Sequence, residues 1–327
     1  MLLKSSNSLS RPKNYPTNKA PSSKSLKFWL SLILALFFAS PLISPPLSFG
    51  QTSAPKTIGL KVLPQPLDRG TAGWVELEEG GVDCQGRFDQ RPIFFFLAPK
   101  IDKTPGRTPG SRWVGLFGAD IMLKPGQYPL TVSCPGQEGL KFSVVVREKT
   151  YGLRNIKVPH GQVDLSPENL ERAAREKKLV DKALATTSPD KLWRGAFLEP
   201  VKGQVNSSFG RQTKINGVLN PRPHAGADYL VKTGTPVKAP ARGQVILTGD
   251  HFFSGQAIYV DHGQGLLSMY FHLSEIMVSD GQMVEKGDII AKSGQSGRVT
   301  GAHLHYGVYL NGARIDPIPF RKMTNQF

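Results

Sequence analysis

Short apolar alternations separated by turn residues fill most of the chain after residue 56. Between 56 and 147, apolar side chains gather in segments of about five residues that Gly, Pro and Asp interrupt. The clearest segments are 58–62, 74–78, 93–97, 128–132 and 142–146. Strands of this length and spacing are typical of a small β-sandwich. We therefore expect a β-sandwich accessory domain over 56–147.

The pattern changes to helical spacing between 166 and 187. Ser166 precedes Pro167, and Glu168 and Glu171 follow in the first turn. A serine N-cap, a proline at the first helical position and early acidic residues mark a helix start. Leucine and alanine then recur at helical intervals until Ser188-Pro189. We predict one connecting helix over 167–185 inside a linker that spans 148–195.

The last third is rich in glycine and in strand-like segments. Apolar runs at 243–248, 257–261, 266–271, 288–292 and 303–309 alternate with turns every 8–12 residues, and no helix-length period appears. This pattern predicts a compact antiparallel β domain over 196–327. The predicted fold is therefore mostly β.

The N-terminal segment reads as an export signal. Six Lys or Arg and no acid occur in residues 1–50, and an almost wholly apolar stretch follows the cationic part at 28–44. This order is typical of a secretory signal peptide, and Ser48-Phe49-Gly50 suits cleavage after Gly50. An uncleaved anchor is the alternative, although three prolines shorten the apolar stretch below the ~20 residues that span a bilayer. We expect an exported protein of the periplasm or cell envelope with no stable membrane span after cleavage.

The charge of the chain bears on its binding partners, and the cysteines bear on a disulfide. The formal charge is +16, and loss of residues 1–50 would lower it by six. Aromatic residues do not interleave with Lys or Arg along a track, so we expect no nucleic-acid partner. A modest positive charge suits encounter with an anionic polymer such as a cell wall. The two cysteines, Cys84 and Cys134, could pair in an oxidising compartment, but sequence alone leaves a disulfide open.

Candidate metal chemistry gathers in the last third of the chain. Four of the seven histidines and one aspartate occur in three motifs: His224-Ala-Gly-Ala-Asp228, Tyr270-Phe-His272 and His303-Leu-His305. Two residues at i and i+2 of a strand share one face, so His303 and His305 lie together. Two imidazoles and one carboxylate can hold a zinc with one coordination position open. Hydrogen-bonded histidines in a polar patch would be the non-functional interpretation.

These motifs resemble the M23 family of zinc metallopeptidases, the lysostaphin-like peptidoglycan endopeptidases. The resemblance covers about 200–320 and includes further blocks: Ser208–Arg211, Gly234–Ala239, His262–Gly265, Gly281 to Gly287, Gly294–Gly297 and Asp316-Pro317. It implies that His224, Asp228 and His305 bind Zn²⁺ and that His272 and His303 are catalytic. It also implies peptidoglycan as substrate and a metal-activated water as nucleophile. The antiparallel β domain over 196–327 would then be catalytic and have a groove, and we expect the loops 211–223 and 249–256 to border that groove. We expect His262 to be structural, and His160 and His251 to face solvent. Arg211 suits either a substrate carboxylate or a salt bridge.

Two other functions compete with the endopeptidase. A catalytically inactive relative could act as a cell-wall scaffold or as an activator of another wall hydrolase. Such relatives typically lack one or more ligands, whereas this sequence has all three. A non-haem iron oxygenase also uses two histidines and a carboxylate, but usually places the acid two residues after the first histidine. The sequence leaves open which peptidoglycan bond is cut, what 56–147 does and how the chain oligomerises.

Overall fold

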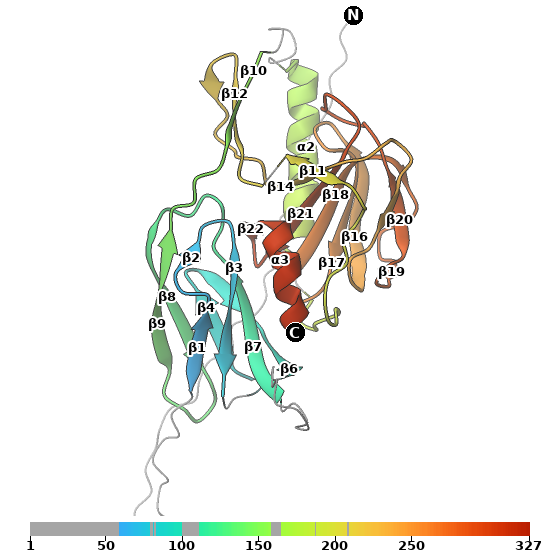
Figure 1. Ribbon diagram of the computed structural model, residues 1–327. Helices are drawn as coiled ribbons and strands as arrows, with labels where there is room; N and C mark the ends of the chain where they lie inside the picture. The colour runs from blue at the N-terminus through green and yellow to red at the C-terminus, as the bar shows by residue number, and fades with distance from the viewer. Residues whose placement is uncertain are drawn as a thin grey trace, which may run out of the picture. The chain divides into compact units, whose positions relative to one another are not determined.

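The computed structural model describes residues 59–327, except for 79–80, 82, 100–110, 158–164, 187 and 208 (Figure 1). The predicted signal peptide and His160 therefore lie outside the described residues. Within the described residues, no helix is both long and apolar enough to cross a membrane. Strands dominate, so the prediction of a mostly β fold is confirmed.

The first part of the described chain contains two sheets that share one hydrophobic core. A four-stranded sheet has the order β1 (Leu60–Leu63), β3 (Ala72–Leu77), β7 (Ser111–Gly118) and β6 (Phe95–Pro99). A five-stranded sheet has the order β2 (Leu67–Asp68), β9 (Leu140–Arg147), β8 (Gly126–Ser133), β4 (Gln85–Phe88) and β5 (Arg91–Ile93). Alternate residues of β3 are buried, as expected for one face of a sandwich. Cys84 and Cys134 form a disulfide inside this core.

The four-stranded sheet is buried on its second face as well. Phe95 and Phe117 belong to the sandwich core, whereas their neighbours Phe96 and Leu116 belong to a second, larger core. Phe96 meets Trp193 edge to face, with ring centroids 5.7 Å apart. A strand buried on both faces gives consecutive apolar residues instead of an alternation, and this explains the adjacent buried Phe95 and Phe96 at the start of β6.

The predicted connecting helix is confirmed as α2 (Pro167–Leu184). The Ser166 side chain accepts a hydrogen bond from the Asn169 amide, and Pro167 occupies the first turn. Arg172 donates to the Asp250 carbonyl at 3.0 Å, and a Glu176 carboxylate oxygen accepts from the Phe252 amide at 2.8 Å. The helix therefore fixes one of the loops that the sequence places around the groove.

A ten-stranded antiparallel sheet forms most of the remaining chain (Figure 1). Its main path runs β11 (Gln204–Ser207), β14 (Gly226–Leu230), β21 (Leu304–Leu310), β18 (Leu266–Ile276), β17 (Gly255–Asp261), β16 (Gly243–His251) and β19 (Met283–Val284). Off this path lie β15 (Pro236–Lys238), β20 (Ile289–Ser293) and β22 (Ala313–Ile315). The larger core lies against this sheet and includes Tyr229, Tyr270 and Val308.

Two elements differ from the sequence prediction. The predicted linker contains β10 (Leu153–Ile156), which pairs in parallel with β12 (Gln212–Ile215), and β12 continues into β13 (Val218–Leu219). The segment 211–223 is therefore partly a strand hairpin. The chain also ends in α3 (Pro317–Met323) and a 3₁₀ turn, η1 (Thr324–Gln326), where only strands were expected. Asp316 caps α3 through the Ile318 amide, so an N-cap followed by proline marked this short helix too.

Candidate metal centre

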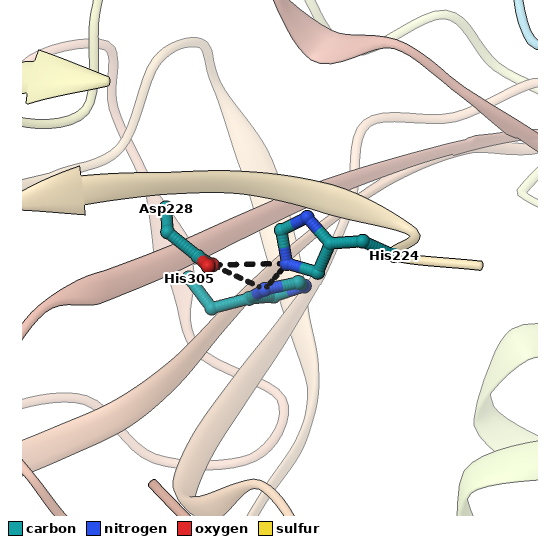
Figure 2. Close-up of side chains that lie close together, drawn as sticks. All are labelled: His224, Asp228 and His305. Carbon is teal, nitrogen blue, oxygen red and sulfur yellow. Dashed lines mark hydrogen bonds and ion pairs between the residues drawn. The ribbon is translucent and has the colours of Figure 1, made fainter. Parts of the chain in front are cut away.

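Two neighbouring strands bring the candidate ligands together (Figure 2). Strands β14 and β21 are antiparallel, and Asp228 lies directly opposite His305 in their register. His224 precedes β14 by two residues, so its ring reaches the same point from the end of the strand. Gly226 makes this approach possible, because a Cβ there would lie 2.5 Å from His305 Nε2. His224 therefore lies in the segment that leads into β14, and Asp228 lies on the strand itself.

Three ligand atoms converge on one point. The distances are 3.0 Å from His224 Nε2 to Asp228 Oδ1, 2.9 Å from His305 Nδ1 to Asp228 Oδ1, and 3.0 Å from His224 Nε2 to His305 Nδ1. Ligands held tetrahedrally at zinc by bonds of about 2.0–2.1 Å lie about 3.3 Å apart. The three atoms therefore form a triangle close in size to one face of a zinc tetrahedron. Two nitrogens and one carboxylate oxygen are also a donor set that zinc accepts.

The local electrostatics favour an ionised Asp228 beside a neutral His305. Burial acts to raise the pKa of Asp228, but hydrogen bonds from His224 and His305 outweigh burial and hold that pKa far below its usual value. Burial lowers the pKa of His305, although the Asp228 carboxylate opposes this effect. A ligating histidine must present a neutral ring nitrogen and a ligating aspartate must be ionised. The lowered pKa values of Asp228 and His305 agree with these two requirements.

Two further histidines border the cluster, each tied to a backbone carbonyl. His272 Nδ1 lies 3.0 Å from the Ser296 carbonyl, and His303 Nδ1 lies 2.8 Å from the Gly301 carbonyl. Because a carbonyl only accepts hydrogen bonds, Nδ1 carries the proton in both rings, and Nε2 of each neutral ring has a lone pair. The two rings are 4.8 Å apart, and His303 Nε2 is 3.8 Å from Asp228 Oδ1.

An irregularity in β18 directs His272 toward the cluster. Its φ is +61°, a conformation uncommon for residues other than glycine. The register of β18 with β17 shifts between Tyr270 and Leu273, as at a β-bulge. The His272 amide donates to the Ser254 carbonyl at 2.8 Å, which fixes the distorted backbone. Burial, followed by the nearby His305 and His303 rings, lowers the pKa of His272 to about 3.

Comparison with known proteins identifies the family. A model of peptidase family M23 matches residues 222–317. The solved structure of a Pseudomonas aeruginosa chain assigned to the same family is 34% identical, with a TM-score of 0.62, over 79% of this chain and 96% of that one. The chain belongs to peptidase family M23.

Curated relatives match less than half of this chain. Peptidoglycan DD-endopeptidase ShyA of Vibrio cholerae is 36% identical over 129 residues, which are 39% of this chain and 30% of ShyA. DD-carboxypeptidase/endopeptidase Mpg of Neisseria meningitidis is 36% identical over 128 residues, 38% of this chain and 29% of Mpg. The matches thus span less than a third of the length of these relatives.

The other residues that the sequence analysis singled out, namely His251, His262 and Arg211, do not contribute side chains to the cluster of four histidines and Asp228. His262 is fully buried, with Nδ1 at 2.8 Å from the Arg242 carbonyl and Nε2 at 2.7 Å from Ser268 Oγ, so the expected structural role is confirmed. His251 ends β16 and is only 7% exposed, so the prediction that it faces solvent is wrong. Its partner at 3.4 Å is Ser254 Oγ. Arg211 donates to the Asn206 carbonyl.

Sequence reasoning found the five cluster residues but missed their supports. The Ser296 and Gly301 carbonyls set the tautomers of the two outer histidines, and the Phe271 ring stacks on His305 at 5.2 Å with an interplanar angle of 2°. Every residue has a carbonyl, so no sequence signal singles these out. Phe271 could have been found, because it precedes His272 and lies opposite His305 in the β18–β21 register.

Proposed function

We propose that the protein is a zinc-dependent endopeptidase that hydrolyses peptide bonds of peptidoglycan. The observation that carries this proposal is the convergence of His224, Asp228 and His305 beside two histidines whose Nε2 atoms are not held by a carbonyl. Three protein ligands leave one coordination position for a water or a substrate. Membership of family M23 supports the same chemistry.

The side chains divide into ligands and proton carriers. We assign His224, Asp228 and His305 to the metal; bound zinc would polarise the scissile carbonyl and lower the pKa of a water toward 7. His303 Nε2 takes a proton from that water, since its Nδ1 is committed to the Gly301 carbonyl. His272 Nε2 hydrogen-bonds the oxyanion or donates to the leaving amine. Its low pKa leaves Nε2 without a proton at rest, so the proton that it donates is the one that His303 takes from the water; the two ring centroids are 4.8 Å apart.

The substrate and compartment follow from the relatives. ShyA and Mpg are named for DD-endopeptidase activity, so we propose the same bond class for this chain. Hydrolysis of cross-links requires export to the cell envelope, in keeping with the signal-like residues 1–50. We further propose that residues 196–327 are the peptidase domain and that residues 56–147 are an accessory domain.

Metal analysis combined with an assay on purified sacculi tests the proposal. The purified protein should contain one zinc and release fragments whose masses identify the cleaved bond. Chelation should stop release, and added zinc should restore it. Asp228→Ala should lose the zinc, whereas Asp181→Ala, which removes an exposed carboxylate of α2 outside the cluster, should keep zinc and activity. Zinc without fragment release would support the wall scaffold or activator instead, and iron would support the oxygenase.

A further inference from the structure

A cleft of about 240 Å³ lies beside the loop that carries His224. Its lining comes from two parts of the chain and includes none of the five cluster residues. One wall follows β2, β7 and β9, and the other leads from Gly210 toward His224. The lining residues used below are Arg69, Met122, Glu148, Thr150, Tyr151 and Pro223. The first wall thus belongs to a part of the chain outside the M23 match at 222–317.

The second wall is continuous with the metal centre. Pro223 directly precedes the ligand His224. The Gly210 amide donates to the His224 carbonyl at 2.8 Å, and the His224 amide donates to the Arg211 carbonyl at 3.0 Å. The cleft wall at Pro223 therefore lies one residue along the chain from a candidate ligand.

Directed contacts fix the two walls to each other. Tyr151 Oη donates to the Arg69 carbonyl at 2.7 Å, and its ring meets Phe209 edge to face. Gly210, at φ +81°, leaves room for that ring, since a Cβ there would lie 2.2 Å from Tyr151 Cδ1. The Gln212 amide donates to the Gly152 carbonyl, which begins the β10–β12 pairing. The shape of the cleft is therefore fixed by specific contacts between its two walls.

The chemistry of the cleft suits a peptide that bears a carboxylate. Arg69 Nη2 pairs with Glu148 Oε1 at 2.6 Å, but its buried Nε has no hydrogen-bond partner within the described residues. The Glu148 side chain is 51% exposed, and a pair of this kind contributes little stability. A ligand carboxylate can therefore replace Glu148 and bind the guanidinium through two nitrogens. Met122 and Pro223 add apolar surface for the stem side chains.

We propose that this cleft is a substrate-binding subsite that holds the peptide stem beyond the cleaved bond, with Arg69 binding a stem carboxylate. The inference rests on the proposed function and extends it to residues outside the M23 match. A subsite of this kind lowers KM and leaves the chemical step unchanged, because it binds substrate and transition state equally.

The test compares stem peptides with free and with amidated carboxylates. For Arg69→Met we expect KM for the free-carboxylate peptide to rise about tenfold while kcat stays within about twofold. Amidation should raise the wild-type KM by a similar factor and should have little further effect on Arg69→Met. Arg147→Met is the matched control, because this arginine also forms an ion pair on the same sandwich but lies outside the cleft.

A second variant and a binding measurement keep the outcomes distinct. Thr150→Trp places a large ring in the cleft from an exposed position and should raise KM for both peptides. Equal KM values for wild type, Arg69→Met and Thr150→Trp, all folded, would overturn the subsite. Calorimetry with chelated protein reports peptide binding without turnover. If the peptide binds in a way that depends on Arg69 but the protein cleaves nothing after zinc is restored, the endopeptidase proposal is refuted. The cleft would then still be a peptide-binding site.

Discussion

Histidines occupy two very different environments within the M23 part of the chain. His262 is fully buried, and both of its ring nitrogens have protein partners, a backbone carbonyl and a hydroxyl. His272 and His303 each use one nitrogen on a carbonyl and direct the other ring edge toward the Asp228 cluster. Burial alone does not separate the two kinds, because His305 is also largely enclosed.

The difference lies in how many ring nitrogens the protein itself satisfies. A histidine with both nitrogens bonded has no site left for a proton or a metal, so it contributes to stability. A histidine with one nitrogen committed has a fixed tautomer and a known reactive atom. The Ser296 and Gly301 carbonyls therefore matter as much as the rings that they orient.

Substitution of His272 or His303 tests this comparison and should have the largest of the expected effects, a loss of turnover. His303→Ala should lower turnover by about 10²–10⁴-fold, the usual contribution of a positioned acid or base. Zinc content, measured by mass spectrometry of the metal, should stay at one per chain. For His272 the suitable variant is His272→Asn, because asparagine tolerates the positive φ at this position. His251→Gln, outside the cluster, is the control. Loss of zinc in either variant would mean that the ring is a ligand.

Substitution of the buried His262 should have the opposite effect, namely a loss of stability without a loss of zinc or turnover. His262→Ala leaves a cavity and removes the partner of Ser268 Oγ, so we expect the free energy of unfolding to fall by about 3 kcal/mol. Zinc content and turnover of the folded fraction should be unchanged. Denaturant titration measures the loss, with His303→Ala as the matched substitution that should cost less than about 1 kcal/mol. A fall in turnover without a fall in stability would place His262 in the catalytic machinery.

Local signals carried most of the sequence prediction. Ser166 and Pro167 mark the start of α2 because a cap and a proline act within one turn. The i, i+2 spacing of His303 and His305 reflects strand geometry, which is also local. The grouping of the cluster residues depended on a resemblance to known sequences, since no local rule joins His224 to a residue 81 positions later.

The missed features depend on long-range partners. Strand β10 is four residues long and pairs with β12, which lies more than 50 residues further on. Its sequence, Leu153–Ile156, has two polar central residues and no clear apolar alternation. His251 appeared to face solvent because nearby glycine and polar residues, such as Asp250 and Ser254, are typical of a loop. Its ring is nevertheless covered in the fold and lies 6.1 Å from the Tyr259 ring. Burial of this kind arises only after the strands pair.

The smallest expected effect is a pH dependence of stability that arises from His262. Burial lowers the pKa of His262 to about 4, whereas a histidine in the unfolded chain titrates near 6.5. Between these values the unfolded state binds the extra proton, so the stabilisation is complete above pH 6.5 and is lost as the pH falls toward 4. From pH 7 to pH 5 this residue should cost the wild type about 2 kcal/mol of unfolding free energy.

Denaturant titrations of chelated protein at both pH values, for wild type and His262→Gln, isolate this contribution. The other histidines titrate equally in both proteins, so they cancel in the comparison. The wild type should lose about 2 kcal/mol more than the variant between pH 7 and pH 5. An equal loss would mean that His262 accepts a proton in the folded state. It would then have a nitrogen free after all, and the count of satisfied ring nitrogens would no longer separate structural from functional histidines.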